Sequence, residues 1–229
     1  MVALGFLAGL FVARKETARK GLNANVMYDL FVYIFVGGLL GARIWFVLFY
    51  WPHDTERTVY EILAFWNGGM AFFGGFLGAL FSGYLFTQSR QLSFWAYADA
   101  VVPGLVIGHA IGRVGCYLTG LHLGVQTTVP WAFYVLNGEM AGQLRHPVVV
   151  YEILYLLLIF VVLMKMRPRL AYAGMMSAGY GVLYGTARFL NDFLREEATD
   201  ARYWGLTATQ YGLLVVVIIG LVYLLRKRA

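Results

Sequence analysis

The most informative stretch of this 229-residue sequence reads IGHAIGRVGCYLTGLH, from Ile107 to His122. It places one arginine, Arg113, among glycines in a run that is otherwise apolar enough to lie in a membrane. A cation at bilayer depth costs roughly 2.5–3.5 kcal/mol on insertion scales, so an anionic or polar group must meet it there. That group is either a buried carboxylate of the chain or the phosphate of a lipid or substrate.

The composition places the whole chain in a membrane. Sixty per cent of the residues are hydrophobic and only 13% are charged, whereas a soluble domain carries about 25% charged residues. The length suits a single membrane domain covering residues 1–229. The only cysteine, Cys116, excludes an internal disulfide and a cysteine-based metal site. We expect neither a metal ion nor a cofactor.

The apolar runs predict an all-α, polytopic bundle of seven transmembrane helices, because each run is long enough to cross a bilayer. The first helix, formed by the apolar N-terminal run, is expected to be short. The other six are predicted at residues 28–51, 62–86, 95–118, 147–166, 172–195 and 207–225.

The basic residues predict the orientation, because cytoplasmic connections collect lysine and arginine. Three connections on the other side hold Arg57, Arg145 and Arg202, beside acidic residues at 54, 56, 139, 196, 197 and 200. We therefore expect the N-terminus outside and the C-terminus in the cytoplasm. The net charge of +6 needs no nucleic-acid partner to explain it. The eleven basic residues on the predicted cytoplasmic side are Arg14, Lys15, Arg19, Lys20, Arg90, Lys165, Arg167, Arg169, Arg226, Lys227 and Arg228.

One connection is much longer than the others. Residues 119–146, between the fourth and fifth predicted helices, form an arm that the orientation places outside the cell. Its prolines and glycines predict an irregular course with short helical pieces. Long ordered loops are usually functional, so we expect the arm to belong to the site.

Charged side chains on four predicted helices converge in the outer half of the membrane, because each residue advances a helix by about 1.5 Å. Arg188, Asp192 and Arg195 share one helix face. Two interpretations remain open. In a buried ion-pair network, Arg188 pairs with Asp192, and Arg43 or Arg113 pairs with Glu152. Alternatively, the excess of four arginines over two carboxylates binds a phosphate, which guanidinium groups grip bidentately.

The ordered motifs of the chain resemble those of the phosphatidylglycerol–prolipoprotein diacylglyceryl transferases. Each motif alone would be weak, but together they run in order from residue 41 to residue 210. They are GAR at 41–43, WNGGMAFFGG at 66–75, GHAIGRVGC at 108–116, RHPVVVYE at 145–152, RFLNDFLR at 188–195 and GLTATQ at 205–210.

The resemblance implies a reaction at a lipid headgroup. Enzymes of this family transfer the diacylglyceryl group of phosphatidylglycerol to the thiol of the lipobox cysteine of a prolipoprotein. A thioether forms and glycerol phosphate is released. The implied partners are therefore phosphatidylglycerol, prolipoprotein signal peptides and the lipid bilayer. The implied location is the bacterial cytoplasmic (inner) membrane.

The resemblance also implies roles for individual residues. Arg113 matches the position that holds the lipid headgroup, and Arg188 matches a second essential arginine at the reaction centre. Asp192 is expected to support Arg188, and His146 is a candidate for proton transfer. The substrate-binding residues implied or inferred beside them are Arg43, Gly112, Gly115, Gly124, Tyr151, Glu152 and Arg195.

The sequence departs from the family pattern at Phe73, where members carry histidine or tyrosine. No general base is expected at this position, which leaves ionisation of the thiol to the arginine field. Two other functions are weighed beside the transferase. One is a non-catalytic phospholipid-binding protein of the same fold. The other is an anion transporter, which the lack of a half-to-half repeat disfavours.

Overall fold

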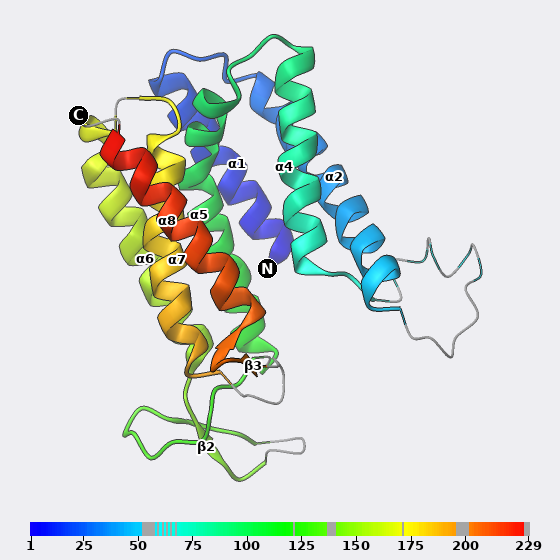
Figure 1. The fold of residues 1–229 in the computed structure, drawn as a ribbon, viewed down its shortest axis with the longest axis vertical. Helices are drawn as coiled ribbons and strands as arrows, with labels where there is room; N and C mark the ends of the chain where they lie inside the picture. The colour runs from blue at the N-terminus through cyan, green and yellow to red at the C-terminus, as the bar shows by residue number, and fades with distance from the viewer. Residues whose placement is uncertain are drawn as a thin grey trace. The chain divides into compact units, whose positions relative to one another are not determined.

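The computed structural model describes the chain apart from residues 52–57, 59, 61, 63, 65, 67, 121, 137–140, 171, 196–201 and 227–229. The described part is all-α and has seven α-helices, which confirms the predicted class and the predicted number of helices (Figure 1). They are α1 (Val2–Arg19), α2 (Val26–Phe49), α4 (Phe72–Ser89), α5 (Phe94–Leu118), α6 (Val148–Met166), α7 (Met175–Asp192) and α8 (Ala208–Arg226).

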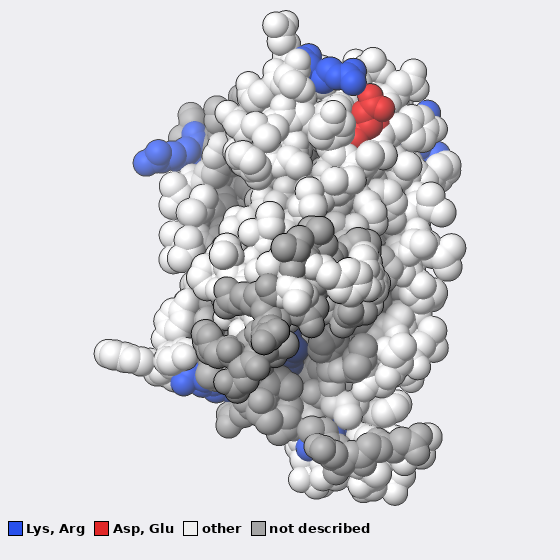
Figure 2. All heavy atoms as spheres, turned by 90° about the vertical axis from the view of Figure 1, so that its right-hand side faces the viewer, with Lys and Arg blue, Asp and Glu red and all other residues white. Residues whose placement is uncertain are grey.

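The helices make this a multi-pass membrane protein. Among the described residues, four segments are long and apolar enough to span a bilayer: α2, α5, α6 extended by the 3₁₀ turn η2 (Arg167–Arg169), and α8. Figure 2 shows a face whose described surface is mostly uncharged, as contact with lipid chains requires. The predicted orientation stays a prediction. The acidic connections expected near residues 54–56 and 196–200, and the basic residues 227 and 228, lie outside the described residues.

The predicted bounds of three helices were wrong. The third helix begins at Phe72 rather than at residue 62, because Gly68 and Gly69 adopt left-handed φ angles of 87° and 72° that a helix cannot contain. The sixth begins after Gly174, which has a φ of 92°, and ends at Asp192 rather than at residue 195. The first continues to Arg19, so most basic residues predicted in the first loop lie in α1.

The chain divides into two compact units, one of residues 17–97 and the other of residues 1–16 with 98–229. In the first, α2 and α4 pack closely through glycines. A Cβ atom at Gly41 would collide with the Gly74 carbonyl oxygen, and one at Gly78 with the Gly37 carbonyl oxygen. Because lipid supplies no hydrophobic drive between helices, such close backbone approach is what holds a membrane pair together.

The larger unit joins α1 to α5, and it also packs α6 against α7 and α7 against α8. A Cβ atom at Gly104 would strike the Gly9 carbonyl oxygen, so α1 lies directly on α5. The carboxylate of Asp99 accepts hydrogen bonds from the backbone N–H groups of Gly174 and Ser177, at 2.8 Å each, and from the Ser177 hydroxyl at 2.7 Å. Asp99 therefore caps the N-terminus of α7 and fixes it to α5.

The arm between α5 and α6 is built from extended backbone, which corrects the expected helical pieces. It contains β1 (Phe133–Tyr134) and β2 (Leu144–Arg145), paired antiparallel. The Val125 N–H donates to the Leu194 carbonyl (2.9 Å), and the His146 N–H donates to the Val125 carbonyl (3.1 Å). The arm is thereby tied to the chain just after α7. A second hairpin, β3 (Arg202–Tyr203) with β4 (Leu206–Thr207), leads into α8.

Candidate active site

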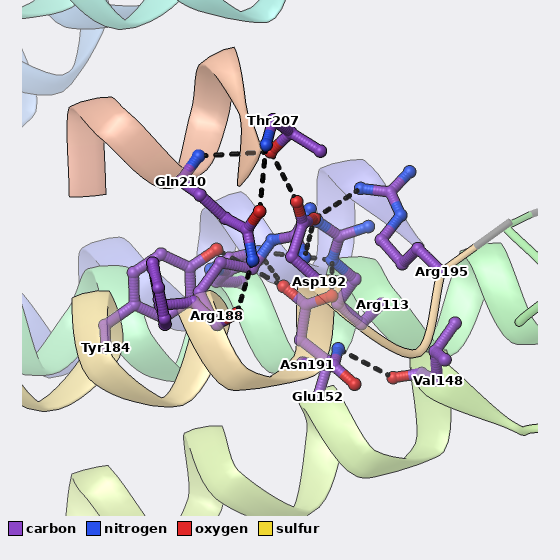
Figure 3. A network of polar contacts seen from close by, with 12 residues as sticks. Arg113, Val148, Glu152, Tyr184, Arg188, Asn191, Asp192, Arg195, Thr207 and Gln210 are labelled. Carbon is purple, nitrogen blue, oxygen red and sulfur yellow. Dashed lines mark hydrogen bonds and ion pairs between the residues drawn. The ribbon is translucent and has the colours of Figure 1, made fainter. Parts of the chain in front are cut away.

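The first charge pair of the site joins α5 to α6. Arg113 Nε lies 3.1 Å from Glu152 Oε2, and the Glu152 side chain is only 5% exposed. The same Nε lies 3.3 Å from His109 Nε2, one helical turn earlier. The hydroxyl of Tyr184, from α7, donates to Glu152 Oε1 at 3.3 Å. The carboxylate thus receives groups from two helices (Figure 3).

The second charge pair lies within α7. Arg188 Nη1 is 2.9 Å from Asp192 Oδ1, and the Asp192 side chain is 1% exposed. Although these atoms are close, neither makes a hydrogen bond in the described part of the chain. The other carboxylate oxygen, Asp192 Oδ2, accepts a 2.6 Å hydrogen bond from the Thr207 hydroxyl. The Gln210 amide oxygen in turn accepts from the Thr207 N–H at 2.9 Å.

Arg195 is the least constrained guanidinium of the group. It follows the end of α7, and its Nη1 lies 3.9 Å from Asp192 Oδ1. Its backbone pairs with Gly124 of the arm, which holds its Cα while leaving the long side chain adjustable. We use the name arginine cluster for the five residues Arg113, Glu152, Arg188, Asp192 and Arg195.

The arginine cluster contains both predicted ion pairs and still has a net positive charge. Its three guanidinium groups exceed its two carboxylates by one positive charge. Glu152 also acts electrostatically on Arg188, so the two pairs form one field. A phosphodiester carries one negative charge and would neutralise that surplus. The ion-pair network and the phosphate site are therefore compatible.

Arg43 lies in the other unit and is engaged by backbone. Its guanidinium donates to the carbonyl oxygens of Ile62 (2.8 Å), Gly68 (2.6 Å) and Gly69 (2.8 Å). These bonds hold the left-handed turn before α4. The backbone carbonyl groups satisfy the Arg43 guanidinium without any lipid. The predicted role of Arg43 in binding the headgroup stays a prediction.

His146 and Tyr151 meet at the entrance of α6. His146 Nδ1 lies 3.1 Å from the Tyr151 hydroxyl oxygen. The same oxygen accepts a 2.7 Å hydrogen bond from the Trp131 indole N–H of the arm. The two predicted side chains therefore also anchor the arm. Their roles in proton transfer and substrate binding stay predictions.

The three predicted glycines have different surroundings. Around Gly112 an added Cβ would meet no described atom within 4 Å, so space is open beside Arg113. At Gly115 it would lie 2.9 Å from Met1 Cβ, and at Gly124 2.6 Å from the His146 carbonyl oxygen. Gly115 and Gly124 therefore have packing reasons to be glycine, whereas Gly112 leaves room for a ligand.

Tyr184, Thr207 and Gln210 complete the cluster but received no role from the sequence. Tyr184 stands one helical turn before Arg188, and this i, i+4 spacing was the available signal. Gln210 is fully buried, and its amide donates to the Phe189 carbonyl at 3.2 Å. A buried amide in the first turn of a spanning helix signals a polar partner, but the sequence does not say which one.

Comparison with known proteins identifies the family. The sequence model of the family described as prolipoprotein diacylglyceryl transferase matches residues 1–226. The chain belongs to this family. Relatives named phosphatidylglycerol–prolipoprotein diacylglyceryl transferase support the assignment. One from Clostridioides difficile strain 630 is 32% identical over 198 residues, covering 86% of this chain and 77% of its own length.

Two further relatives of the same name cover nearly the whole chain. The protein from Streptococcus agalactiae serotype Ia is 33% identical over 235 residues, which span 99% of this chain and 89% of the relative. The protein from Aliarcobacter butzleri is 32% identical over 248 residues, which span 100% and 88%. As a member of the prolipoprotein diacylglyceryl transferase family, the chain is a membrane transferase. The arginine cluster is its candidate active site.

Proposed function

We propose that this chain transfers the diacylglyceryl group of phosphatidylglycerol to the lipobox cysteine thiol of prolipoproteins. The observation that carries the proposal is the single surplus positive charge of the arginine cluster, which a phosphodiester neutralises. Family membership supplies the reaction class. The open space beside Gly112 adjoins Arg113 and supports entry of a headgroup there.

In the proposed reaction, Arg113 grips the lipid phosphate and Arg188 faces the bond that breaks. The thiolate sulfur attacks the glyceryl carbon bound to the phosphate, and a carbon–sulfur bond forms as the carbon–oxygen bond breaks. The electron pair leaves with glycerol phosphate. Negative charge grows on the departing oxygen, so fixed guanidinium groups stabilise the transition state more than the bound lipid.

Arg195 and Asp192 support this step. Asp192 holds Arg188 through the 2.9 Å contact and is itself fixed by Thr207. Arg195 has the longest contact in the cluster, 3.9 Å, so it can follow the phosphate as it departs. The proposed setting is the outer half of the cytoplasmic membrane, with the arm facing the incoming prolipoprotein.

The test is a transfer assay with the purified full chain. Vesicles of phosphatidylglycerol are mixed with a lipobox peptide, and mass spectrometry follows the peptide. A thioether-linked diacylglyceryl adduct is expected on the cysteine peptide and not on its serine counterpart. Folded protein that binds the vesicles but yields no adduct would instead support the non-catalytic lipid-binding function.

A further inference from the structure

The proposed reaction requires an acceptor for the thiol proton. A free thiol has a pKa near 8.5, so only a few per cent is ionised at neutral pH. A cationic field stabilises the thiolate but does not carry the proton away. Phe73 has no titratable group. Its ring packs edge-on against Trp45, with ring centroids 4.9 Å apart. The acceptor must therefore lie elsewhere.

Two of the three described histidines are already engaged; the fourth in the sequence, His53, lies outside the described residues. His109 Nε2 accepts the Arg113 Nε–H at 3.3 Å. His146 Nδ1 is bound to the Tyr151 hydroxyl. The Trp131 indole N–H donates to the same hydroxyl oxygen. His146 is thereby engaged in the contact that anchors the arm.

His122 is the remaining imidazole, and it makes no hydrogen bond or ion pair with any described residue. It follows α5, with an exposed side chain on a backbone of φ 61°. It lines a small cavity at the root of the arm together with Tyr117, Phe133 and His146. The cavity has room for about 20 Å³, roughly one water molecule. Because the His122 side chain is exposed, a substrate thiol arriving from the arm side can reach the ring.

The charges around His122 come from α5, α6 and α7 and from Arg195 just after α7. Partial burial lowers the pKa of His122, and the guanidinium groups of Arg195, Arg113 and Arg188 lower it further, while Glu152 opposes them. A lowered pKa means that the ring is neutral at pH 7 and protonates only below its ordinary value of about 6.5. His122 thus offers a free lone pair within the field of the arginine cluster.

We propose that His122 is the general base that accepts the thiol proton in this enzyme. The assignment rests on the proposed transferase function. The S–H proton moves to a His122 ring nitrogen, and the sulfur keeps the electron pair with which it attacks the glyceryl carbon. After glycerol phosphate departs, the imidazolium returns its proton to water. The arginine cluster then stabilises both the thiolate and the leaving phosphate.

The decisive experiment compares a cysteine lipobox peptide with its selenocysteine counterpart. A selenol is largely ionised at neutral pH and needs no base. The variant is His122→Asn, because asparagine tolerates left-handed φ angles but does not accept a proton. With the thiol, transfer at pH 7 should fall by about 10²–10⁴-fold, the usual contribution of general base catalysis. With the selenol, the variant should stay within a few-fold of the wild type.

The pH profile provides a second readout. Wild-type kcat/KM should be level from pH 7 to 8 and fall as His122 protonates in the acid range. In the His122→Asn protein it should rise about tenfold per pH unit, following thiol ionisation. Added imidazole should restore thiol transfer to a His122→Gly protein, whose backbone is relaxed at this position.

The outcomes distinguish a failure of the His122 assignment from a failure of the transferase function. Equal losses with thiol and selenol would show that His122 is structural and would overturn the assignment. Unchanged thiol transfer in His122→Asn would also overturn it while leaving the transferase function intact. If folded wild-type protein transfers to neither peptide, the transferase function itself fails, and the assignment with it.

Discussion

At the scale of single residues, the site is governed by buried pairs of opposite charge. Arg113 with Glu152, and Arg188 with Asp192, each place a carboxylate of at most 5% side-chain exposure against a guanidinium. Removing one partner of such a pair leaves an uncompensated charge and costs about 3–5 kcal/mol. A single alanine substitution at such a pair can therefore lower activity either by destabilising the fold or by removing a group that the reaction needs.

A matched pair of variants separates these effects. Arg113→Ala should lower the free energy of unfolding by about 3–5 kcal/mol, because Glu152 stays buried and charged. The double variant Arg113→Gln with Glu152→Gln removes both charges and should unfold close to the wild-type temperature. Both should lose lipid transfer. Wild-type transfer rates in the folded double variant would show that Arg113 does not bind the headgroup.

The open space at Gly112 gives a second prediction. Gly112→Leu should fold normally, since no described atom lies within 4 Å of the added Cβ. It should nevertheless raise the KM for phosphatidylglycerol at least about tenfold if the headgroup occupies that space, a loss of roughly 1.4 kcal/mol. Gly212→Leu is the matched control, because Gly212 is also open but lies in α8. Equal effects in both proteins would argue against a ligand at Gly112.

At the scale of helices and strands, the apolar runs predicted the seven α-helices of the described part of the chain but not all of their ends. The start of α4 depends on the left-handed turn at Gly68 and Gly69, which Arg43 holds from the neighbouring helix α2. The arm was harder to predict. Its strands of two residues are too short to show a hydrophobic period. They pair with each other, and the backbone of Val125 pairs with both Leu194 and His146. Such long-range backbone pairing cannot be derived from local composition.

The cap on α7 yields a prediction at this scale. Asp99→Ala removes three hydrogen bonds and leaves two backbone N–H groups without their carboxylate. Each unsatisfied group costs about 1–3 kcal/mol, so thermal unfolding in detergent should move clearly downward. Ser177→Ala removes one of the three bonds and should cost about 1 kcal/mol. If α7 docks correctly in the surviving protein, its kcat should stay near wild type.

At the scale of the whole molecule, the sequence predicted the ion pair within α7, but it left open which arginine pairs with Glu152. Spacing along α7 was enough to place Arg188 beside Asp192. The choice of Arg113 rather than Arg43 as the partner of Glu152 depends on helix packing. Thr207, in the hairpin before α8, contacts Asp192, and Gln210, in α8, contacts Thr207. Residue spacing along a single helix cannot predict these contacts.

The predicted orientation is tested by labelling from one side. In a Cys116→Ala background, single cysteines are placed at Thr128 in the arm and at Gln88 near the end of α4, both exposed positions. An impermeant maleimide should label Thr128→Cys in intact spheroplasts and Gln88→Cys only after permeabilisation. The reverse pattern would place the arm in the cytoplasm and refute the positive-inside assignment.

The most direct test of the central claim counts both products of one turnover. Phosphatidylglycerol is labelled separately in its headgroup and acyl chains, and excess purified protein is mixed with a limiting amount of lipobox peptide. The account predicts one released glycerol phosphate for each thioether-linked diacylglyceryl group, with no release when the peptide cysteine is serine. The neutral double variant of Arg113 and Glu152 should give neither product. Headgroup release without peptide, or a folded wild-type protein that yields no thioether, would contradict the account.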